Sequence, residues 1–211
     1  AIGTSSRKPD RMALIEPFVQ AVQSARAEKV LRADHRLHFR CEVTDPLMLE
    51  TLEALLERVH PDAMSIMDHA PGKRQVRDVE DMVQWMVARR GETADRARAF
   101  AVDFIRESEE NGATRSLLVA EHARGLGIAL ATHDDETPEH VAFANAIGAH
   151  YSEFPVTRLA AEAAVASGLP TTMGAPNVVR GQSSGGNVDA RSLIHEGLVT
   201  ALLSDYVPSS Q

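Results

Sequence analysis

Polar side chains stand at the ends of six short apolar runs in this chain of 211 residues. In a parallel sheet that alternates with helices, the carboxyl ends of the strands share one face, so such groups meet there despite their separation in sequence. Carboxylate and imidazole at one rim predict a metal site, because oxygen and nitrogen ligands together suit Zn2+, Mn2+ or a similar divalent ion. The groups are Arg40-Cys41-Glu42, Asp68-His69, His133-Asp134-Asp135, Ser152-Glu153, Asn177 and Ser204-Asp205.

Four of these residues carry the metal prediction: Glu42, His69, His133 and Asp205. Each alone has a simpler explanation, since a histidine can be a hydrogen-bonded core residue and a carboxylate can cap a helix. Glu42 is the hardest to explain in this way, because a buried carboxylate without a cation or donor is costly. A salt bridge to Arg40 is the structural alternative. The coincidence of four such residues at the ends of buried runs favours the metal.

His38 shares the alternating face of Glu42 but is expected to lie elsewhere. Four residues at roughly 3.3 Å each place it roughly 13 Å below Glu42 along the strand. We therefore expect His38 to support the floor of the site and not to bind the metal.

Basic residues and glycines form a second constellation after two other runs. Lys73 and Arg74 follow His69 directly, and a Gly- and Ser-rich loop follows a later strand. Glycines let backbone N–H groups approach a ligand, and the arginine fork matches phosphate oxygens. This pattern predicts a phosphate pocket; the alternative is an ordinary loop with solvated arginines. The candidate substrate-binding residues are Lys73, Arg74, Asn177, Arg180, Ser183 and Ser184.

Alternation of side chains predicts how two strands present these groups. In residues 37–43 the odd positions are apolar and the even positions polar, so the apolar set is expected to face helices while Glu42 points inward. The same alternation across residues 63–69 turns His69 inward and leaves Asp68 facing the helices.

Strand and helix patterns alternate along the whole chain, which predicts an α/β fold. About six strand candidates fall short of the eight strands of a complete barrel, and residues 1–4 look like the tail of an earlier strand. We expect one partial barrel domain over residues 1–211, belonging to a larger protein. Residues 71–126 are too long for one short crossover, so a helical insertion at about 76–112 is predicted, with a position suited to a lid.

The composition limits the classes of partner. A formal net charge of −8 argues against a general affinity for nucleic acid or anionic membranes, so an anionic substrate needs local cations. The lone Cys41 excludes an internal disulfide, and no apolar run approaches the roughly 18–20 residues of a membrane span. We predict a cytoplasmic protein, with homo-oligomerisation favoured by the edges of an unclosed sheet.

Six motifs, in the same order from about residue 30 to the end, resemble a known family. That family is the PhnM-type alpha-D-ribose 1-methylphosphonate 5-triphosphate diphosphatases of the amidohydrolase superfamily, and MGAPNVVRG is the most specific part of the match. The motifs are HRLHFRCEV (35–43), MDHAPGKRQ (67–75), THDDET (132–137), EFPVT (153–157), MGAPNVVRGQSSGGNV (173–188) and LSDYVP (203–208).

The resemblance implies a metal-dependent (β/α)8 TIM-type barrel that releases pyrophosphate from a phosphorylated small molecule in the carbon–phosphorus lyase pathway. From the ligand types we expect zinc as the first choice of metal, with manganese or magnesium as alternatives. The resemblance also implies roles for individual residues. Glu42 takes the place of a bridging carboxylate, His69 and His133 are metal ligands, Asp205 is a ligand and proton acceptor, and Lys73, Arg74 and Arg180 contact anions.

The sequence departs from the family pattern in ways that keep other functions open. Residues 1–211 do not contain the histidine-containing strand motif with which related sequences begin, nor the far C-terminal part of the family. The loop at 180–187 reads RGQSSGGN where the family pattern RGGSHSGN has a histidine. The alternatives are an amidohydrolase acting on a cyclic amide or aminated ring, and a catalytically silent barrel fragment.

Overall fold

Seven strands form one parallel sheet in which every strand lies beside its neighbours in sequence, in the order β1 to β7. The computed structural model describes residues 1–7, 9–183 and 186–204, except the side chains of residues 9–11. The strands are β1 (Ile2–Gly3), β2 (His38–Glu42), β3 (Ala63–Met67), β4 (Ala129–His133), β5 (Tyr151–Glu153), β6 (Thr171–Gly174) and β7 (Ala201–Leu203). The predicted α/β class is confirmed. Strand β1 lies within residues 1–4, which were expected to be the end of a strand that comes before the six strand candidates.

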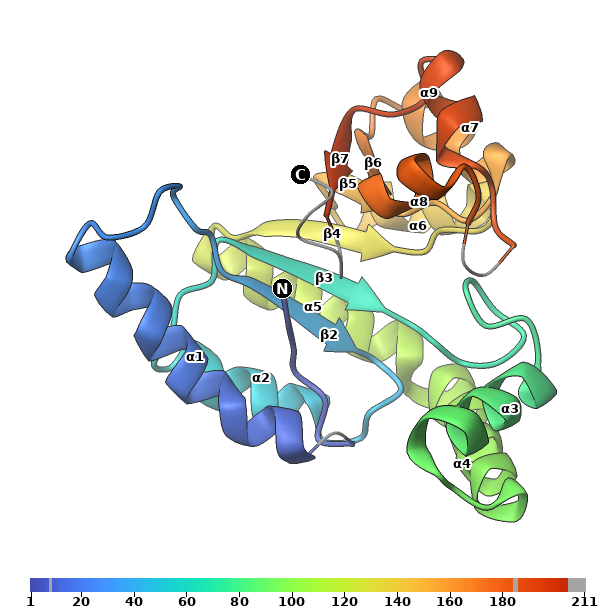
Figure 1. Ribbon diagram of the computed structural model, residues 1–211, viewed down its shortest axis with the longest axis horizontal. Coiled ribbons are helices and arrows are strands. Elements are labelled where there is room, and N and C mark those ends of the chain that lie inside the picture. Colours follow the sequence, from blue (N-terminus) through green and yellow to red (C-terminus); the bar gives the residue numbers. More distant parts are fainter. Residues whose placement is uncertain (8, 184–185, 205–211) are drawn as a thin grey trace.

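Helices connect the strands and lie outside a curled sheet (Figure 1). Parallel neighbours joined in sequence order through helices make a half-barrel, compatible with part of a (β/α)8 barrel. The helices are α1 (Pro9–Ala27), α2 (Met48–Leu56), α3 (Val79–Arg90), α4 (Ala94–Glu107), α5 (Ala113–Leu126), α6 (Pro138–Ala146), α7 (Arg158–Ala166), α8 (Ala175–Arg180) and α9 (Ala190–His195), with a π-helix, η1 (Ser108–Gly112), between α4 and α5. None of the helices in the described part of the chain is long and apolar enough to cross a membrane.

The main core lies between β2 and β3 on one side and α1, α2 and α5 on the other. Phe39 and Cys41 are fully buried and stand in register with Met64 and Ile66 of β3. These are the apolar positions of the predicted alternation, so the polar positions between them face the inside of the curl. Burial of the apolar face therefore fixes which side chains the sheet turns inward.

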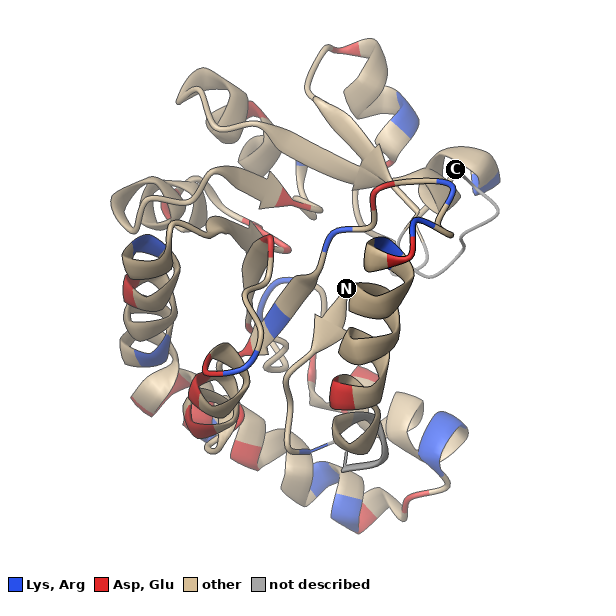
Figure 2. Cartoon of the chain, turned by 90° about the vertical axis from the view of Figure 1, so that its left-hand side faces the viewer, with Lys and Arg blue, Asp and Glu red and all other residues tan. Residues whose placement is uncertain are grey.

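Inward-facing residues at the carboxyl ends of neighbouring strands are aligned with one another in the register of the sheet. Glu42 is in register with Met67, and His133 of β4 is in register with Glu153 of β5. Because Ile66 pairs with Thr132, the next residue on each strand brings Met67 level with His133. Figure 2 shows acidic positions, in red, at the ends of several strands.

The segment expected to be a helical insertion holds α3, α4 and η1. Helices α3 and α4 share a small core of their own that includes Met86 and Phe104. Arg7 joins this pair to the barrel, because its Nη2 donates to Asp103 at 2.7 Å and to the Thr44 carbonyl at 3.1 Å. The guanidinium also lies over the ring of Phe104, 4.7 Å from the centroid.

Leu52 tests the position of the main core. It is fully buried in α2, so Leu52→Ala should lower the free energy of unfolding by about 2–5 kcal/mol through lost burial and a residual cavity. Leu14, 64% exposed in α1, is the control, and Leu14→Ala should change it by about 0.5 kcal/mol or less. Urea denaturation measures both variants. Equal losses would contradict the burial of Leu52 against the sheet.

Candidate metal centre

Three side chains at the carboxyl ends of β3 and β4 form a compact group of potential ligands: His69, His133 and Asp134. Each offers one ligand atom, and these atoms all lie within 4.8 Å of one another. Oδ2 of Asp134 is 2.8 Å from Nδ1 of His133 and 3.5 Å from Nε2 of His69. Two imidazole nitrogens and a carboxylate oxygen are a ligand set suited to a divalent transition-metal ion.

Backbone geometry brings Asp134 into this group. Along a regular strand its side chain would point away from that of His133, but Asp134 adopts a left-handed φ of 56°. This conformation is unfavourable for a non-glycine residue and persists where surrounding contacts fix it. One such contact is the Asp134 N–H, which donates to the Glu153 carbonyl at 2.8 Å. The turn at the end of β4 thus directs the carboxylate toward the two histidines.

Two buried polar atoms of the group show that its residues fit a cation. Nδ1 of His133 and Oδ2 of Asp134 are buried, and neither has a hydrogen bond of acceptable geometry among the described residues. Buried polar atoms without a hydrogen-bond partner are rare and costly, so each such atom calls for an explanation. A divalent ion coordinated by His133, His69 and Asp134 would satisfy both atoms.

Glu42 supports this group from β2. Its Oε2 accepts a hydrogen bond from Nδ1 of His69, and its Oε1 accepts from the Thr44 hydroxyl at 2.9 Å and the His69 N–H at 3.3 Å. A carboxylate in this position fixes the tautomer and the orientation of the imidazole that it contacts. Arg40 is not the partner of Glu42 that the sequence offered as an alternative. Its Nη2 instead lies 2.5 Å from Nε2 of His133.

Electrostatics keep the group charged in the absence of a metal. Burial disfavours a charge on His69, but Glu42 and Asp134 outweigh it and raise the pKa of His69 to about 10. Burial likewise opposes the charge of Glu42, whose pKa is nevertheless lowered by His69. Metal binding must therefore displace a proton from His69.

His38 lies on the same inward face of β2, two residues before Arg40. Burial lowers the pKa of His38 to about 3, so the ring is neutral. One of its ring nitrogens, Nε2, lies 2.9 Å from the Ser65 hydroxyl. These contacts agree with the expected role of His38 in the floor of the site.

Arg74 holds the loop after β3 against the metal centre. Its Nη1 donates to Asp135 at 2.9 Å and to the carbonyl of His133 at 2.6 Å. Asp135 is fully buried and also accepts hydrogen bonds from the hydroxyls of Thr132 and Ser152. Arg74 was predicted to contact a substrate anion. In the structure, one nitrogen of its guanidinium instead compensates the buried carboxylate of Asp135.

Lys73 is also in contact with protein groups. Its Nζ donates to the Ser108 hydroxyl of η1 at 2.7 Å and lies 4.0 Å from Asp68. Asp68 in turn accepts from Ser108 at 2.6 Å, which places its side chain toward the helices as the alternation predicted. Arg180 lies at an exposed position in the last turn of α8.

The remaining predicted site residues lie on other segments. Asn177 is in α8 and its buried Oδ1 has no hydrogen-bond partner in the described ranges, while Ser183 is half-buried in the following loop. Ser184 and Asp205 lie outside the described residues, so their predicted roles stay predictions.

Two acidic residues in the centre were not among the predicted ligands. Asp134 completes the ligand group, and Oε2 of Glu153 lies 3.6 Å from Nε2 of His133. Both follow or end a buried run, which was the available signal in the sequence. The pairing of His133 with Glu153 and the left-handed turn at Asp134 were needed to select them.

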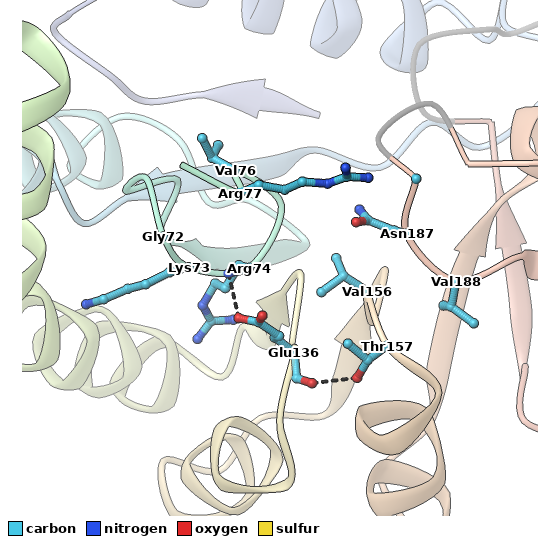
Figure 3. Close-up of a pocket in the computed structure, with 11 residues that line it drawn as sticks. Gly72, Lys73, Arg74, Val76, Arg77, Glu136, Val156, Thr157, Asn187 and Val188 are labelled. Atoms are coloured by element: carbon cyan, nitrogen blue, oxygen red, sulfur yellow. Dashed lines mark hydrogen bonds between the residues drawn. The ribbon is translucent and has the colours of Figure 1, made fainter. Parts of the chain in front are cut away.

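A pocket of about 420 Å3 opens among the loops at the carboxyl ends of the strands (Figure 3). The segments that line it follow β3, β4, β5 and α8, so it lies at the same mouth of the sheet. Its lining residues are Gly72, Lys73, Arg74, Val76, Arg77, Glu136, Val156, Thr157, Gly186, Asn187 and Val188.

Comparison with known proteins confirms the resemblance that the motifs indicated. The chain is 36% identical over 210 residues to the alpha-D-ribose 1-methylphosphonate 5-triphosphate diphosphatase of Escherichia coli (strain K12). The match covers 100% of this chain and 56% of that relative, so the chain spans little more than half of the relative's length. No family model matches the chain.

The first prediction for the centre concerns metal affinity. Asp134→Asn removes the charge of one ligand and should weaken binding of Zn2+ or Mn2+ at least about tenfold, since even residues that only support a ligand contribute about 10- to 100-fold. Glu139→Gln, at an exposed position in the first turn of α6, should leave the affinity unchanged. Isothermal titration calorimetry measures both. Unaltered affinity of the Asp134 variant would exclude it as a ligand.

The second prediction concerns the stability of the metal-free chain. Folding raises the pKa of His69 from 6.5 to about 10, so the stabilisation by the Glu42–His69 pair is complete below pH 6.5 and is lost as the pH rises toward about 10. Glu42→Gln removes a charge that raises this pKa. The free energy of unfolding of this variant should therefore fall less steeply across that range. Urea denaturation at several pH values tests this, and identical slopes would disprove the coupling.

Proposed function

We propose that this chain carries the metal centre of a metal-dependent phosphoanhydride hydrolase of the amidohydrolase superfamily. The proposed reaction is the release of pyrophosphate from alpha-D-ribose 1-methylphosphonate 5-triphosphate in phosphonate catabolism. The observation that carries the proposal is 36% identity, over the whole chain, to a protein of this named activity. The buried cluster of His69, His133 and Asp134 supports a reaction that uses a metal.

The substrate and the ligand set agree in their chemistry. A triphosphate carries negative oxygens that repel a nucleophile, so its hydrolysis needs positive charge and an activated water. A divalent ion supplies both, because coordination lowers the pKa of water from about 15.7 to about 7. His69, His133 and Asp134 would hold this ion, with zinc as the first choice and manganese or magnesium as alternatives.

The supporting residues have distinct proposed tasks. Glu42 orients His69 through the hydrogen bond to Nδ1, and Arg40 contacts the opposite side of the centre at His133. In the proposal, Asp205 is a further ligand and accepts a proton from the attacking water.

Anion binding in the proposal falls to cations around the mouth of the sheet. Arg74 uses Nη1 for Asp135 and for the His133 carbonyl, and it also lines the pocket, so its other donors can serve a phosphate oxygen. Arg180 is exposed at the end of α8 and is proposed to contact the leaving pyrophosphate together with Arg74.

Turnover assays test the function directly. The complete chain supplied with Zn2+ or Mn2+ should release pyrophosphate from alpha-D-ribose 1-methylphosphonate 5-triphosphate, as measured by phosphorus NMR. Asp205→Asn should lower kcat by about 10²–10⁴-fold, the usual range for loss of a general base, with an unchanged circular dichroism spectrum.

Two outcomes would contradict the proposal. Hydrolysis of cyclic amides or deamination of aminated rings in place of the triphosphate would support the amidohydrolase alternative. Tight metal binding without any turnover would support a catalytically silent barrel fragment. Full activity of Asp205→Asn would remove that residue's assigned role, whereas Glu139→Gln should match the parent chain.

A further inference from the structure

Arg74 links the pocket at the mouth of the sheet to the candidate metal centre. It lines the pocket and donates to the main-chain carbonyl of His133, whereas His69, His133 and Asp134 themselves do not line the pocket. In the proposed function the phosphates beyond the reacting one extend away from the centre, and the pocket lies among the same loops. Such an extension needs positive charge nearby, because the chain carries a net charge of −8.

The pocket lining includes Lys73, Arg74 and Arg77, whose charged groups point in different directions. The ammonium group of Lys73 is hydrogen-bonded to Ser108 and points away from the pocket (Figure 3). Arg74 directs Nη1 to the buried Asp135. Arg77 extends across the pocket toward Asn187, from the loop after β3 to the segment after α8 (Figure 3).

Gly186 determines where the Arg77 guanidinium can lie. A Cβ atom at this position would stand 2.0 Å from Nη2 of Arg77 and 3.3 Å from its Cζ. Gly186 also has a left-handed φ of 71°, which side chains rarely adopt. The guanidinium thus lies against bare backbone, and any larger residue at this position would displace the end of Arg77.

We infer that Arg77 binds phosphate oxygens of the substrate in this pocket and that Gly186 sets the position of its guanidinium. The inference rests on the proposed function, which it deepens by naming the residue that binds the phosphates beyond the reacting one. The planar arginine fork matches two phosphate oxygens at once, and the Asn187 amide across the pocket offers further donors.

Binding of inorganic pyrophosphate tests the role of Arg77 without any turnover. Titration calorimetry on the complete metal-loaded chain, with excess Mg2+ to keep pyrophosphate from stripping the centre, should show at least about tenfold weaker binding for Arg77→Ala, as expected for a lost hydrogen bond to a charged group. Arg89→Ala, which removes an exposed cation of α3, is the matched control and should bind like the parent chain. Equal affinity of the Arg77 variant and the parent would overturn the inference.

Gly186→Ala tests the positioning. It should weaken pyrophosphate binding more in the parent chain than in the Arg77→Ala chain. The part of its effect that acts through the displaced guanidinium is absent without Arg77, whereas the strain of an alanine at φ 71° is common to both chains. Additive losses would overturn the role given to Gly186.

Kinetics separate this inference from the proposed function. If the substrate is cleaved, Arg77→Ala should raise KM more than it lowers kcat, and an unchanged KM would refute the inference. A chain that binds pyrophosphate through Arg77 but cleaves no triphosphate would refute the proposed function and leave only the phosphate-binding role of Arg77 supported.

Discussion

Buried carboxylates at the mouth of the sheet require compensating positive charge, and this requirement organises the site. Glu42 is compensated by His69, Asp135 by Arg74, and Asp134 by the two histidines that it approaches. Removing such groups from water is unfavourable unless each finds a partner. The loops that supply the partners are thereby held in fixed positions around the candidate metal centre.

The same requirement gives one arginine two functions. By compensating Asp135, Arg74 fastens the loop after β3 to the end of β4 and donates to the carbonyl of the candidate ligand His133. The loop then carries Arg77 across the pocket to Gly186. Arg74 thus contacts the end of β4 at the candidate metal centre and also lines the proposed phosphate pocket.

The insertion helices are connected to the loop after β3 through η1. Ser108 in the π-helix contacts both Lys73 and Asp68, the residues on either side of the His69 loop. π-helical turns within longer helices are frequent at functional sites. Here the turn provides a polar anchor for the loop, while Arg7 fixes α4 to the segment after β2.

The sequence by itself determined the α/β class, the inward side of β2 and β3, and the meeting of Glu42, His69 and His133. It could do so because alternation has a period of two and the ends of parallel strands share one face. Only the tertiary structure decided that Asp134 and Glu153 join them, that Arg74 pairs with Asp135, and that Arg77 reaches Gly186. These contacts depend on strand register, on a left-handed turn and on side-chain directions across distant loops, which local patterns of residues do not encode.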